Sequence, residues 1–416
     1  MQRIPLTPRD DWQQKVESAG LTFHSPEGMD RPYWDESAAY EFTAAEIDTL
    51  EAAANTLQEM CLAAAQHVID EKRYAELDIP AEAISAIEWA WNNEPPALYG
   101  RFDLSWAGAA SGQAPKLLEY NADTPTSLLE AAVIQWSWLE EQSPTLASGN
   151  PDQFNSIHDK LIAKWKDIDP YLSKPVYFAG LDNPEDQLTL VYLRDTAQQA
   201  GLDTLQMFME EIGWNDEQQA FLDPDEQPMF SIFKLYPWEA MVQEEFGIHA
   251  VETYQSTRWI EPIWKMLLSN KGILPILWQL YPNHELLLES HFDTTAPQRM
   301  SDGTIASNTG GWMPVGSTIA SSAAPNNMRN YVRKPLHSRE GANITIVRDN
   351  AAIATTDGPY NGPQIVQALA PEAAFDNRYP ILGLWMVDQS CCGLGIRESA
   401  GLITDNLSSF IPHYFV

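Results

Sequence analysis

Cysteine is scarce in this sequence, with three residues among 416. Cys61 falls in a helical pattern, and Cys391 and Cys392 are direct neighbours, an arrangement poorly suited to a structural disulfide. None of them stands near a His at a spacing typical of a metal site or of an activated thiol. We therefore expect reduced cysteines that serve in packing, which excludes a disulfide-stabilised scaffold.

Basic residues are also few, with 25 Lys and Arg against 58 Asp and Glu and a formal net charge of −33. No cluster of Lys and Arg marks a groove for a phosphate backbone, so we expect no nucleic-acid partner. The acidic excess has two interpretations: a solvated surface that maintains solubility, or an acidic well that attracts a cationic substrate.

Long apolar runs are absent. No stretch approaches the ~20 apolar residues needed to cross a bilayer, and the start "MQRIPLTPRDDWQQK" lacks the apolar core of a signal peptide. We therefore expect a cytoplasmic protein without a membrane partner.

Apolar and aromatic residues are nevertheless abundant. They make up 44% of the chain and include 15 Trp, 15 Tyr and 14 Phe, which is typical of a folded protein rather than a disordered one. The length of 416 residues exceeds the roughly 250 to 300 residues at which single cores stop growing. We expect two or three lobes packed against one another.

The order of the predicted elements indicates an α/β (α+β) protein. An Ala-rich helix is predicted from 44 to about 74, and strands at 98–105 and 115–123 predict a β-hairpin. A strand, a helix and another strand then predict a small parallel α/β unit over approximately 170–235. A loop rich in Ser, Thr, Gly and Asn follows at 300–329, before further short strands.

The predicted hairpin carries the candidate chemistry. Polar side chains alternate along its two strands: Arg101, Asp103, Glu119, Asn121 and Asp123. Apolar side chains fill the intervening positions: Phe102, Leu104, Leu118, Tyr120 and Ala122. If both apolar faces meet the core, then the polar side chains project from one side of the sheet.

Two carboxylates and an amide oxygen are hard ligands that suit Mg²⁺, completed by water or substrate phosphates. Arg101 alongside them could offset anionic charge that develops in a reaction. The alternative is an Asp–Arg salt bridge on a solvated sheet face.

A helix is predicted to start directly after the second strand. Thr124 is a good N-cap, Pro125 suits the first helical position, and Ser127 is the third residue of that helix. Its free N–H groups would face the metal site and could receive a carboxylate at Thr124 and Thr126. As plain structure, the same residues describe a well-capped helix.

Five motifs, in this order, resemble the synthetase portion of the glutathionylspermidine synthase family: "YGRFDL", "LLEYNADTPTSLLEAA", "NKGILPILW", "RKPLHSREGANI" and "GLGIRE". Less characterised relatives in that family are described as acid–amine ligases. The resemblance covers nearly the whole chain. It implies a permuted ATP-grasp-like fold, in which the metal ligands precede the nucleotide-binding lysines.

The resemblance also implies the roles of individual residues. Asp103 and Glu119 would hold one Mg²⁺, Glu119 and Asn121 a second, and Arg101 would be the catalytic residue that stabilises the transition state. The implied ATP contacts are Arg101, Phe102, Asp103, Lys271, Lys334, Glu340, Gly341, Gln367, Ala368, Leu369, Ala370, Met386 and Val387. Glu185 and Asp186 match the acidic pair that receives the amine, although acids also favour the first turn of any helix.

The resemblance implies an ATP- and Mg²⁺-dependent ligase that joins a carboxylic acid to an amine through an acyl phosphate, with small-molecule substrates. We expect segments 1–168 (helices and metal hairpin), 169–235 (small α/β domain) and 236–416 (nucleotide-binding part). Nothing corresponds to the amidase domain of the bifunctional members, so hydrolysis of the product is not expected. Thr124 and Pro125 replace a serine-containing stretch, which argues against glutathione as the acid.

Two other classes of function remain open. Many Trp and carboxylate residues also suit a glycoside hydrolase with two acids flanking the sugar bond, but such an enzyme needs neither Lys271 nor Lys334. A non-catalytic acidic polyamine-binding protein would retain the fold and lose turnover.

Overall fold

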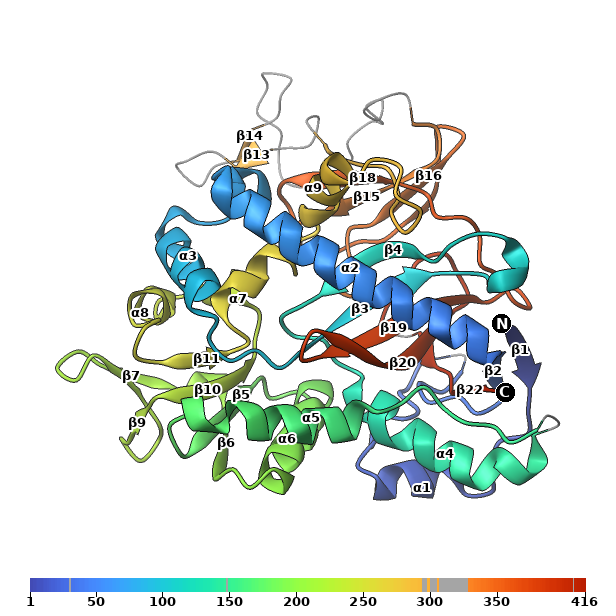
Figure 1. The fold of residues 1–416 in the computed structure, drawn as a ribbon, viewed down its shortest axis with the longest axis horizontal. Helices are drawn as coiled ribbons and strands as arrows, with labels where there is room; N and C mark the ends of the chain where they lie inside the picture. Colours follow the sequence, from blue (N-terminus) through green and yellow to red (C-terminus); the bar gives the residue numbers. More distant parts are fainter. Residues whose placement is uncertain (30, 147–148, 294–297, 300–304, 307–327, 407) are drawn as a thin grey trace.

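A computed structural model describes the chain except residues 30, 147–148, 294–297, 300–304, 307–327 and 407. The predicted loop at 300–329 therefore lies largely outside the described residues. The α/β class is confirmed. A long helix crosses a central antiparallel sheet, with a parallel sheet on one side and a second antiparallel sheet on the other (Figure 1).

The central sheet has the strand order β21-β20-β19-β3-β4. Its strands are β3 (Tyr99–Ser105), β4 (Lys116–Asn121), β19 (Tyr379–Val387), β20 (Ser390–Ser399) and β21 (Ser409–Phe410). β3 and β4 pair antiparallel, which confirms the predicted hairpin, and β3 pairs with β19 on its other edge. The hairpin strand β3 therefore lies inside the sheet rather than at its margin.

Helix α2 (Ala44–Asp70) confirms the predicted Ala-rich helix and packs against β19 and β20. A capping box starts it, in which the Thr43 hydroxyl accepts the N–H of Glu46 and the Glu46 carboxylate accepts the N–H of Thr43. Leu50, Leu57 and Cys61 are fully buried against the sheet face that carries Phe102 and Leu384. All three cysteines are buried and free, as the sequence predicts.

The parallel sheet has the order β11-β10-β5-β6. Its strands are β5 (Val176–Gly180), β6 (Thr204–Phe208), β10 (Ser231–Leu235) and β11 (Arg258–Ile260). Helix α6 (Pro184–Gln199) connects β5 to β6, and α5 (Ile157–Ile168) packs on α6. The sheet thus continues to Ile260, beyond residue 235, where the sequence predicts that the small unit ends.

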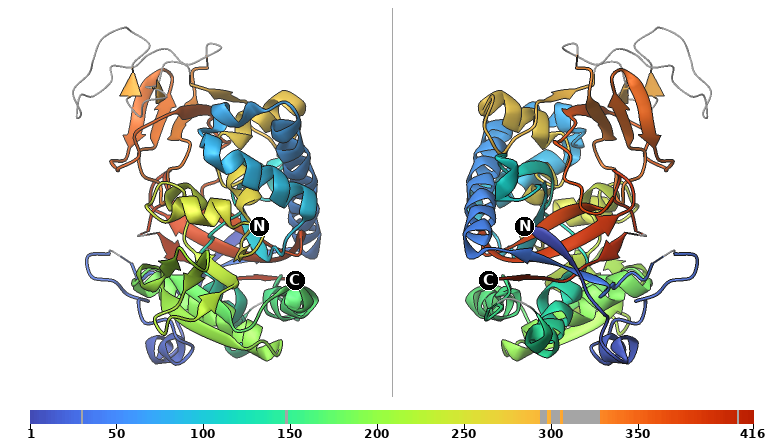
Figure 2. Two further views of the ribbon diagram at one scale, coloured as in Figure 1. Left: turned by 90° about the vertical axis from the view of Figure 1, so that its left-hand side faces the viewer. Right: turned by 90° about the vertical axis from the view of Figure 1, so that its right-hand side faces the viewer.

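The second antiparallel sheet has the order β12-β18-β15-β16-β17. It consists of β12 (Ser290–Phe292), β15 (Tyr331–Pro335), β16 (Thr345–Arg348), β17 (Ala351–Thr355) and β18 (Gln364–Ala368). Side views place this orange sheet at the opposite end of the molecule from the green helices of the parallel unit, with the central sheet between them (Figure 2). Residues of all three sheets, among them Arg101, Lys334 and Leu235, line one cavity.

The remaining elements cover these sheets and close the chain. Both ends meet in a sheet of β1 (Gln2–Pro5), β2 (Ala38–Phe42) and β22 (His413–Phe415). The other helices are α1 (Trp12–Ser18), α3 (Ile84–Asn93), α4 (Gln135–Gln142), α7 (Trp238–Met241), α8 (Gly247–Glu252) and α9 (Ile273–Leu280). Short strands β7 (Gly213–Asn215), β8 (Ala220–Leu222) and β9 (Pro228–Met229) form a small sheet, and β13 (Gln298–Arg299) pairs with β14 (Ile305–Ala306). None of the helices in the described part of the chain combines the length and apolar character that a bilayer crossing requires.

Candidate active site

The hairpin presents its polar side chains to a cavity of about 760 Å³. In the strand register, Arg101 lies opposite Asn121 and Asp103 lies opposite Glu119, and all four line the cavity. Strand alternation together with antiparallel pairing places them on one face, as the sequence predicts.

A β-bulge shifts the register just beyond these pairs. Leu104 pairs with Leu117, so Leu118 has no partner across the hairpin and lines the cavity. The prediction that Leu118 faces the core with Tyr120 was therefore wrong, because the extra residue reverses the alternation at this point. Tyr120 does face the core, where its ring stacks on Phe102 at 3.8 Å between centroids.

The four polar side chains form a compact network of charges. Arg101 binds Asp103 through two hydrogen bonds, Nε to Oδ1 at 2.6 Å and Nη2 to Oδ2 at 3.0 Å, and Asn121 Nδ2 donates to Asp103 Oδ2 at 2.9 Å. Lys271 Nζ lies 2.8 Å from Glu119 Oε2. The Asp–Arg salt bridge of the alternative interpretation is therefore present, but it lies in a cavity with Asp103 buried and not on an open, solvated sheet face.

The neighbouring cations fix the ionisation of Glu119. Burial alone would raise the pKa of Glu119, but Lys271 and Lys334 lower it to about 2. Burial raises the pKa of Asp103 even though Arg101 opposes that shift. Glu119 is therefore a carboxylate at every pH at which the protein would act.

Lys334 brings the second antiparallel sheet up to the hairpin. Its Nζ donates to the carbonyl oxygen of Leu118 at 3.1 Å and to Gln367 Oε1 at 2.8 Å. Gln367 Nε2 donates in turn to the carbonyl oxygen of Leu117 at 3.1 Å. Burial lowers the pKa of Lys334 to about 8, although Glu119 opposes the shift. Strands β15 and β18 are thereby joined to β4 through the two predicted nucleotide residues.

Most of the predicted nucleotide contacts lie on the same cavity. In addition to Arg101 and Asp103, the lining includes Lys271, Lys334, Glu340, Gly341, Gln367, Ala368, Leu369 and Ala370. Glu340 and Gly341 both have positive φ angles, 55° and 69°, in the loop between β15 and β16. A Cβ at Gly341 would come within 2.5 Å of the carbonyl oxygen of Thr404, so this loop position requires glycine.

Three predicted contacts need correction: Phe102, Met386 and Val387 do not line the cavity. Their side chains are at most 1% exposed and pack in the hydrophobic cores. The register pairs Trp385 with Arg101 and Gly383 with Asp103, so these residues of β19, not Met386, face the site.

The predicted helix start at Thr124 was also wrong. Residues 124–127 are not helical, and the helix begins at Leu128, before a π-helical turn over Glu130–Ile134 that leads into α4. Ser127 has a left-handed φ of 64°. Thr126 bonds to Arg101 through its carbonyl oxygen and to Glu185 through its hydroxyl. These tertiary contacts override the capping pattern of the sequence. The start of this helix is thus displaced from Thr124 to Leu128, although Thr124 and Thr126 both line the cavity.

The predicted amine residues reach the cavity from the parallel sheet. Glu185 and Asp186 lie in the first turn of α6, whose N-cap Asn183 accepts the N–H of Asp186 at 2.9 Å. The Thr126 hydroxyl donates to Glu185 Oε1 at 2.6 Å, while Arg101 Nη1 donates to the Thr126 carbonyl oxygen at 2.7 Å. Thr126 therefore joins the phosphate side of the cavity, at Arg101, to the acidic side.

Two arginines of the quoted motifs line the cavity without having been assigned a role. Arg339 binds Thr124 Oγ1 at 2.8 Å and Glu239 Oε1 at 2.7 Å. Arg397, from "GLGIRE", reaches Ser127 Oγ at 3.4 Å. Their positions beside a glycine-containing loop and in a strand of the central sheet were the available signals, but only the fold shows which way they point.

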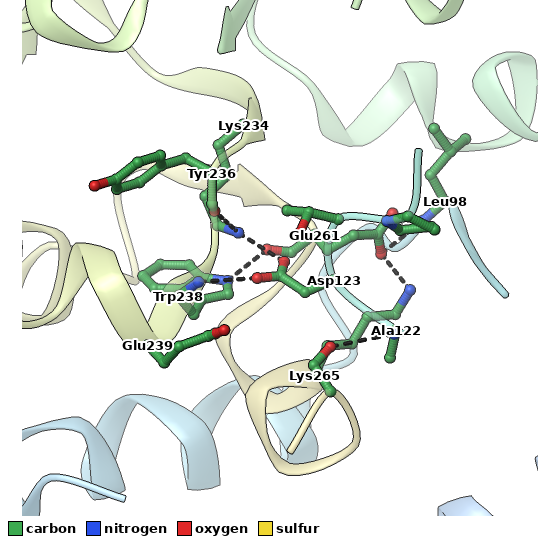
Figure 3. Close-up of polar contacts among 12 residues, drawn as sticks. Leu98, Ala122, Asp123, Lys234, Tyr236, Trp238, Glu239, Glu261 and Lys265 are labelled. Carbon is green, nitrogen blue, oxygen red and sulfur yellow. Dashed lines mark hydrogen bonds and ion pairs between the residues drawn. The ribbon is translucent and has the colours of Figure 1, made fainter. Parts of the chain in front are cut away.

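Asp123 leaves the polar face on which the sequence places it. Its carboxylate binds Lys234 Nζ at 2.6 Å and accepts the N–H of Trp238 at 2.9 Å, and both ionised side chains are fully buried (Figure 3). In the same view, Glu261 accepts the backbone N–H groups of Leu98 and Tyr99. This buried network joins the hairpin to strand β10 and to the residue that follows β11.

The oxygen donors assigned to magnesium fit that ion. Asp103 and Glu119 face each other across the hairpin, and Asn121 adds an amide, a hard donor set that leaves positions for water and phosphate oxygens. Among the described residues, no group of three His, Cys, Asp or Glu side chains gathers at metal-binding spacing, so the amide would be needed as third donor.

Two lysines, an arginine, two carboxylates and an amide thus line one cavity together with the acidic first turn of α6, a set of groups suited to binding phosphates. The family model described as "Glutathionylspermidine synthase preATP-grasp" matches residues 3–416, and the chain belongs to this family. Its relatives are named as an acid–amine ligase and as synthetases, so the class of enzyme is a carbon–nitrogen ligase.

Individual relatives differ in how much of their length this chain covers. It is 37% identical to a Haemophilus influenzae protein named "Putative acid--amine ligase", with full coverage of both chains. It is 27% identical to the trypanothione synthetase of Crithidia fasciculata, over 84% of this chain and 52% of that protein. It is 26% identical to the bifunctional glutathionylspermidine synthetase/amidase of Escherichia coli, over 90% of this chain and 58% of that protein. This chain therefore spans just over half of the latter two proteins.

The fold has a counterpart among solved structures. A glutathione synthetase-like effector from Globodera pallida superimposes with a TM-score of 0.57 over 99% of both chains, at 12% sequence identity. At that identity the likeness concerns the fold alone.

Proposed function

We propose that this protein is an ATP- and Mg²⁺-dependent ligase that forms an amide between a small or peptide-like carboxylic acid and an amine. One observation carries the proposal: Arg101, Asp103, Glu119, Asn121, Lys271 and Lys334 converge from separate segments on one cavity. The family and its amide-forming relatives support the same class of reaction. We also propose the permuted ATP-grasp fold, with segments 1–168, 169–235 and 236–416.

In the proposed reaction, the substrate carboxylate attacks the terminal phosphate of ATP and yields an acyl phosphate and ADP. Attack of the amine then yields the amide and releases phosphate. Arg101 supplies a fixed guanidinium beside the transferring group, and Lys271 and Lys334 add charge that neutralises phosphate oxygens. Little covalent chemistry is asked of the protein, because positioning and charge neutralisation provide most of the rate.

Asp103, Glu119 and Asn121 would hold the magnesium ions, Asp103 with Glu119 and Glu119 with Asn121. Magnesium bound there neutralises negative charge on the phosphate tail. Arg101 and Lys271 pair with the two carboxylates in this structure, and both cations would be available to phosphate oxygens where magnesium compensates the carboxylates instead. Residues 340 and 341 would cover the phosphates, and residues 367–370 would border the adenine.

The substrates would enter from the remaining walls. Thr124 and Thr126 lie beside the phosphate side and would receive the acid, whereas Glu185 and Asp186 would receive the cationic amine. The acidic wall belongs to the parallel sheet and the phosphate wall to the other two sheets. The two substrates would therefore meet near Thr126.

The test is release of ADP from ATP and Mg²⁺, screened against pairs of acids and amines. We expect ADP release to depend on the acid, and Glu119→Ala and Lys334→Ala to reduce turnover by roughly 10² to 10³-fold because each removes charge stabilisation at the phosphates. Glu140→Ala and Lys166→Ala, at exposed positions, serve as matched controls and should retain full turnover.

Unaltered turnover in folded Glu119→Ala and Lys334→Ala would contradict the assigned roles. If no acid promotes ADP release while a polyamine still binds, a non-catalytic binding protein is the better description. A hydrolysis of glycosides that is independent of ATP would instead support the glycosidase alternative.

A further inference from the structure

A chain of hydroxyl groups leads from the cavity to a buried carboxyl group. Ser127 lines the cavity, and its Oγ lies 2.9 Å from the phenolic oxygen of Tyr33. The Tyr33 hydroxyl donates to Glu130 Oε1 at 2.7 Å. Tyr33 and Glu130 are almost wholly buried, with exposed fractions of 3% and 1%. Besides the Tyr33 hydroxyl, the Glu130 carboxylate accepts the N–H group of its own backbone.

The hydrogen bonds in this chain have a single consistent direction. Tyr33 has one hydroxyl proton and gives it to Glu130, so Ser127 must donate to Tyr33. Arg397 Nη1 donates to Ser127 Oγ at 3.4 Å, and its guanidinium carbon lies 5.0 Å from the centroid of the Tyr33 ring. A hydroxyl oxygen has two lone pairs, so Ser127 can accept one further proton donor from the cavity.

The backbone around the chain is unusual in two places. Ser127 has a φ of 64°, a conformation that non-glycine residues adopt at some cost and that is enriched at functional sites. Glu130 begins a π-helical turn, a rare feature that is also frequent at functional sites. Both irregularities act on the residues that form the chain.

Ser127 lies where the two substrates of the proposed ligase would meet. The preceding residue, Thr126, contacts Arg101 through its carbonyl oxygen and Glu185 through its hydroxyl. A primary amine held by Glu185 carries a positive charge and must lose a proton before its nitrogen can attack.

We propose that Ser127, Tyr33 and Glu130 form a proton relay that deprotonates the amine substrate during amide formation. The proposal rests on the proposed ligase function and adds the general base to it. An ammonium proton passes to Ser127 Oγ as the Ser127 proton moves to Tyr33 and the Tyr33 proton moves to Glu130. The new C–N bond then forms and the acyl C–O bond breaks, with its electron pair leaving on phosphate. Of the two protons that the ammonium loses, one rests on Glu130 and the other leaves with phosphate.

The surroundings of Glu130 suit a base that must also release its proton. Burial raises the pKa of Glu130 to about 7, while the hydrogen bond from Tyr33 opposes the shift. Among the charged groups facing it, Glu185 raises this pKa and Arg397 lowers it. A base whose pKa is near the working pH accepts and returns a proton with similar ease.

The test compares two nucleophiles with the acid that supports ADP release. The amine substrate is protonated at neutral pH, whereas hydroxylamine is already largely unprotonated and traps the acyl phosphate as a hydroxamate without a base. We expect Tyr33→Phe and Glu130→Gln to reduce amide formation at least tenfold and to leave the hydroxamate rate within about twofold of wild type. The rate of amide formation by the wild type should fall as the pH drops through about 7, and Glu130→Gln should lack this decrease.

Tyr74→Phe is the matched control, because the Tyr74 hydroxyl also donates to a glutamate, Glu88 Oε1 at 2.9 Å, outside the cavity lining. It should leave both rates unchanged. Ser127→Ala, at the cavity wall, tests the relay independently if a buried variant does not fold.

Unchanged amide formation in folded Tyr33→Phe and Ser127→Ala would overturn the relay. An equal loss of amide and hydroxamate would overturn it too, because the residues would then act before the amine arrives. If wild type shows no acid-dependent ADP release, the ligase function itself fails and the relay with it, an outcome distinct from both others.

Discussion

The carboxylate of Asp186 changes its charge within the pH range in which enzymes are assayed. Burial raises its pKa to about 6, and the neighbouring Glu185 adds to the shift. Above that pH the ionised Asp186 adds a negative charge to the cavity wall beside Glu185. Below it the wall loses one negative charge.

This difference predicts how amine binding depends on pH. A raised carboxyl pKa means that the charged form is present above about pH 6 and is lost as the pH falls through that value. We expect the KM for the amine to rise up to tenfold per pH unit below 6, while Asp186→Asn has a high KM that no longer varies there.

The measurement is the KM for the amine between pH 5 and 8, with Asp182→Asn as control, because Asp182 is an exposed acid of the same loop. The kcat of the amide step reports Glu130 separately, since that group affects the rate rather than binding. An Asp186→Asn variant with wild-type KM at every pH would rule out contact between this residue and the amine.

At the scale of elements, the buried ion pair of Asp123 and Lys234 connects the segment that follows β4 to strand β10. Both side chains are fully buried, and burial lowers the pKa of Lys234 although Asp123 opposes the shift. Removal of one partner leaves a buried charge without compensation, which typically costs about 3 to 5 kcal/mol.

We therefore expect Lys234→Met to reduce the free energy of unfolding by roughly 3 kcal/mol, and the double variant Asp123→Asn with Lys234→Met to recover most of that loss. Urea denaturation measures both. Lys72→Met, which breaks the exposed pair of Lys72 with Glu88, is the control and should cost less than about 1 kcal/mol. A double variant as unstable as the single one would show that the charge of Asp123 is not the cause.

The elements also show which parts of the site a sequence can predict. Alternating polar residues predict the hairpin and its four polar side chains, because a strand buried on one face leaves a clear pattern. The bulge at Leu118 and the extended turn at Thr124 cannot be predicted from this pattern, because cross-strand register and tertiary contacts determine them. Tyr33, Arg339 and Arg397 come from distant segments with no local signal that they face the same space. Met386 was misplaced because only pairing with β3 fixes the inward face of β19.

At the scale of the whole molecule, His413 bonds the C-terminal strand β22 to residues 135 and 153, in the middle of the chain. Its Nδ1 lies 2.9 Å from Gln135 Oε1, and its backbone carbonyl oxygen accepts a bond from Gln153 Nε2. The imidazole is fully buried, and its Nε2 has no hydrogen-bond partner among the residues that the structure describes. Burial lowers the pKa of His413 to about 3, so the folded protein keeps this ring neutral.

His413 is protonated near pH 6.5 in the unfolded chain but only near pH 3 in the folded protein. Protonation therefore favours the unfolded state, and the free energy of unfolding falls as the pH drops below 6.5. At pH 5 this amounts to about 2 kcal/mol. We expect His413→Asn to show a correspondingly smaller loss of unfolding free energy between pH 7 and pH 5, measured by urea denaturation. His284→Asn, at a partly exposed position, should keep the wild-type loss. A wild-type pH slope in His413→Asn would assign the acid sensitivity to another group.

Arg101 and Lys334, two of the residues proposed for phosphate, lie on strands of two antiparallel sheets, whereas Glu185 and Asp186 lie on the first turn of a helix in the parallel unit. In the proposed function, the residues that bind phosphate and the residues that select the amine therefore belong to separate segments of the sequence. A library confined to residues 181–186 should yield catalysts with altered amine preference that still activate the original acid. The same scaffold becomes a starting point for making unfamiliar amides by directed evolution.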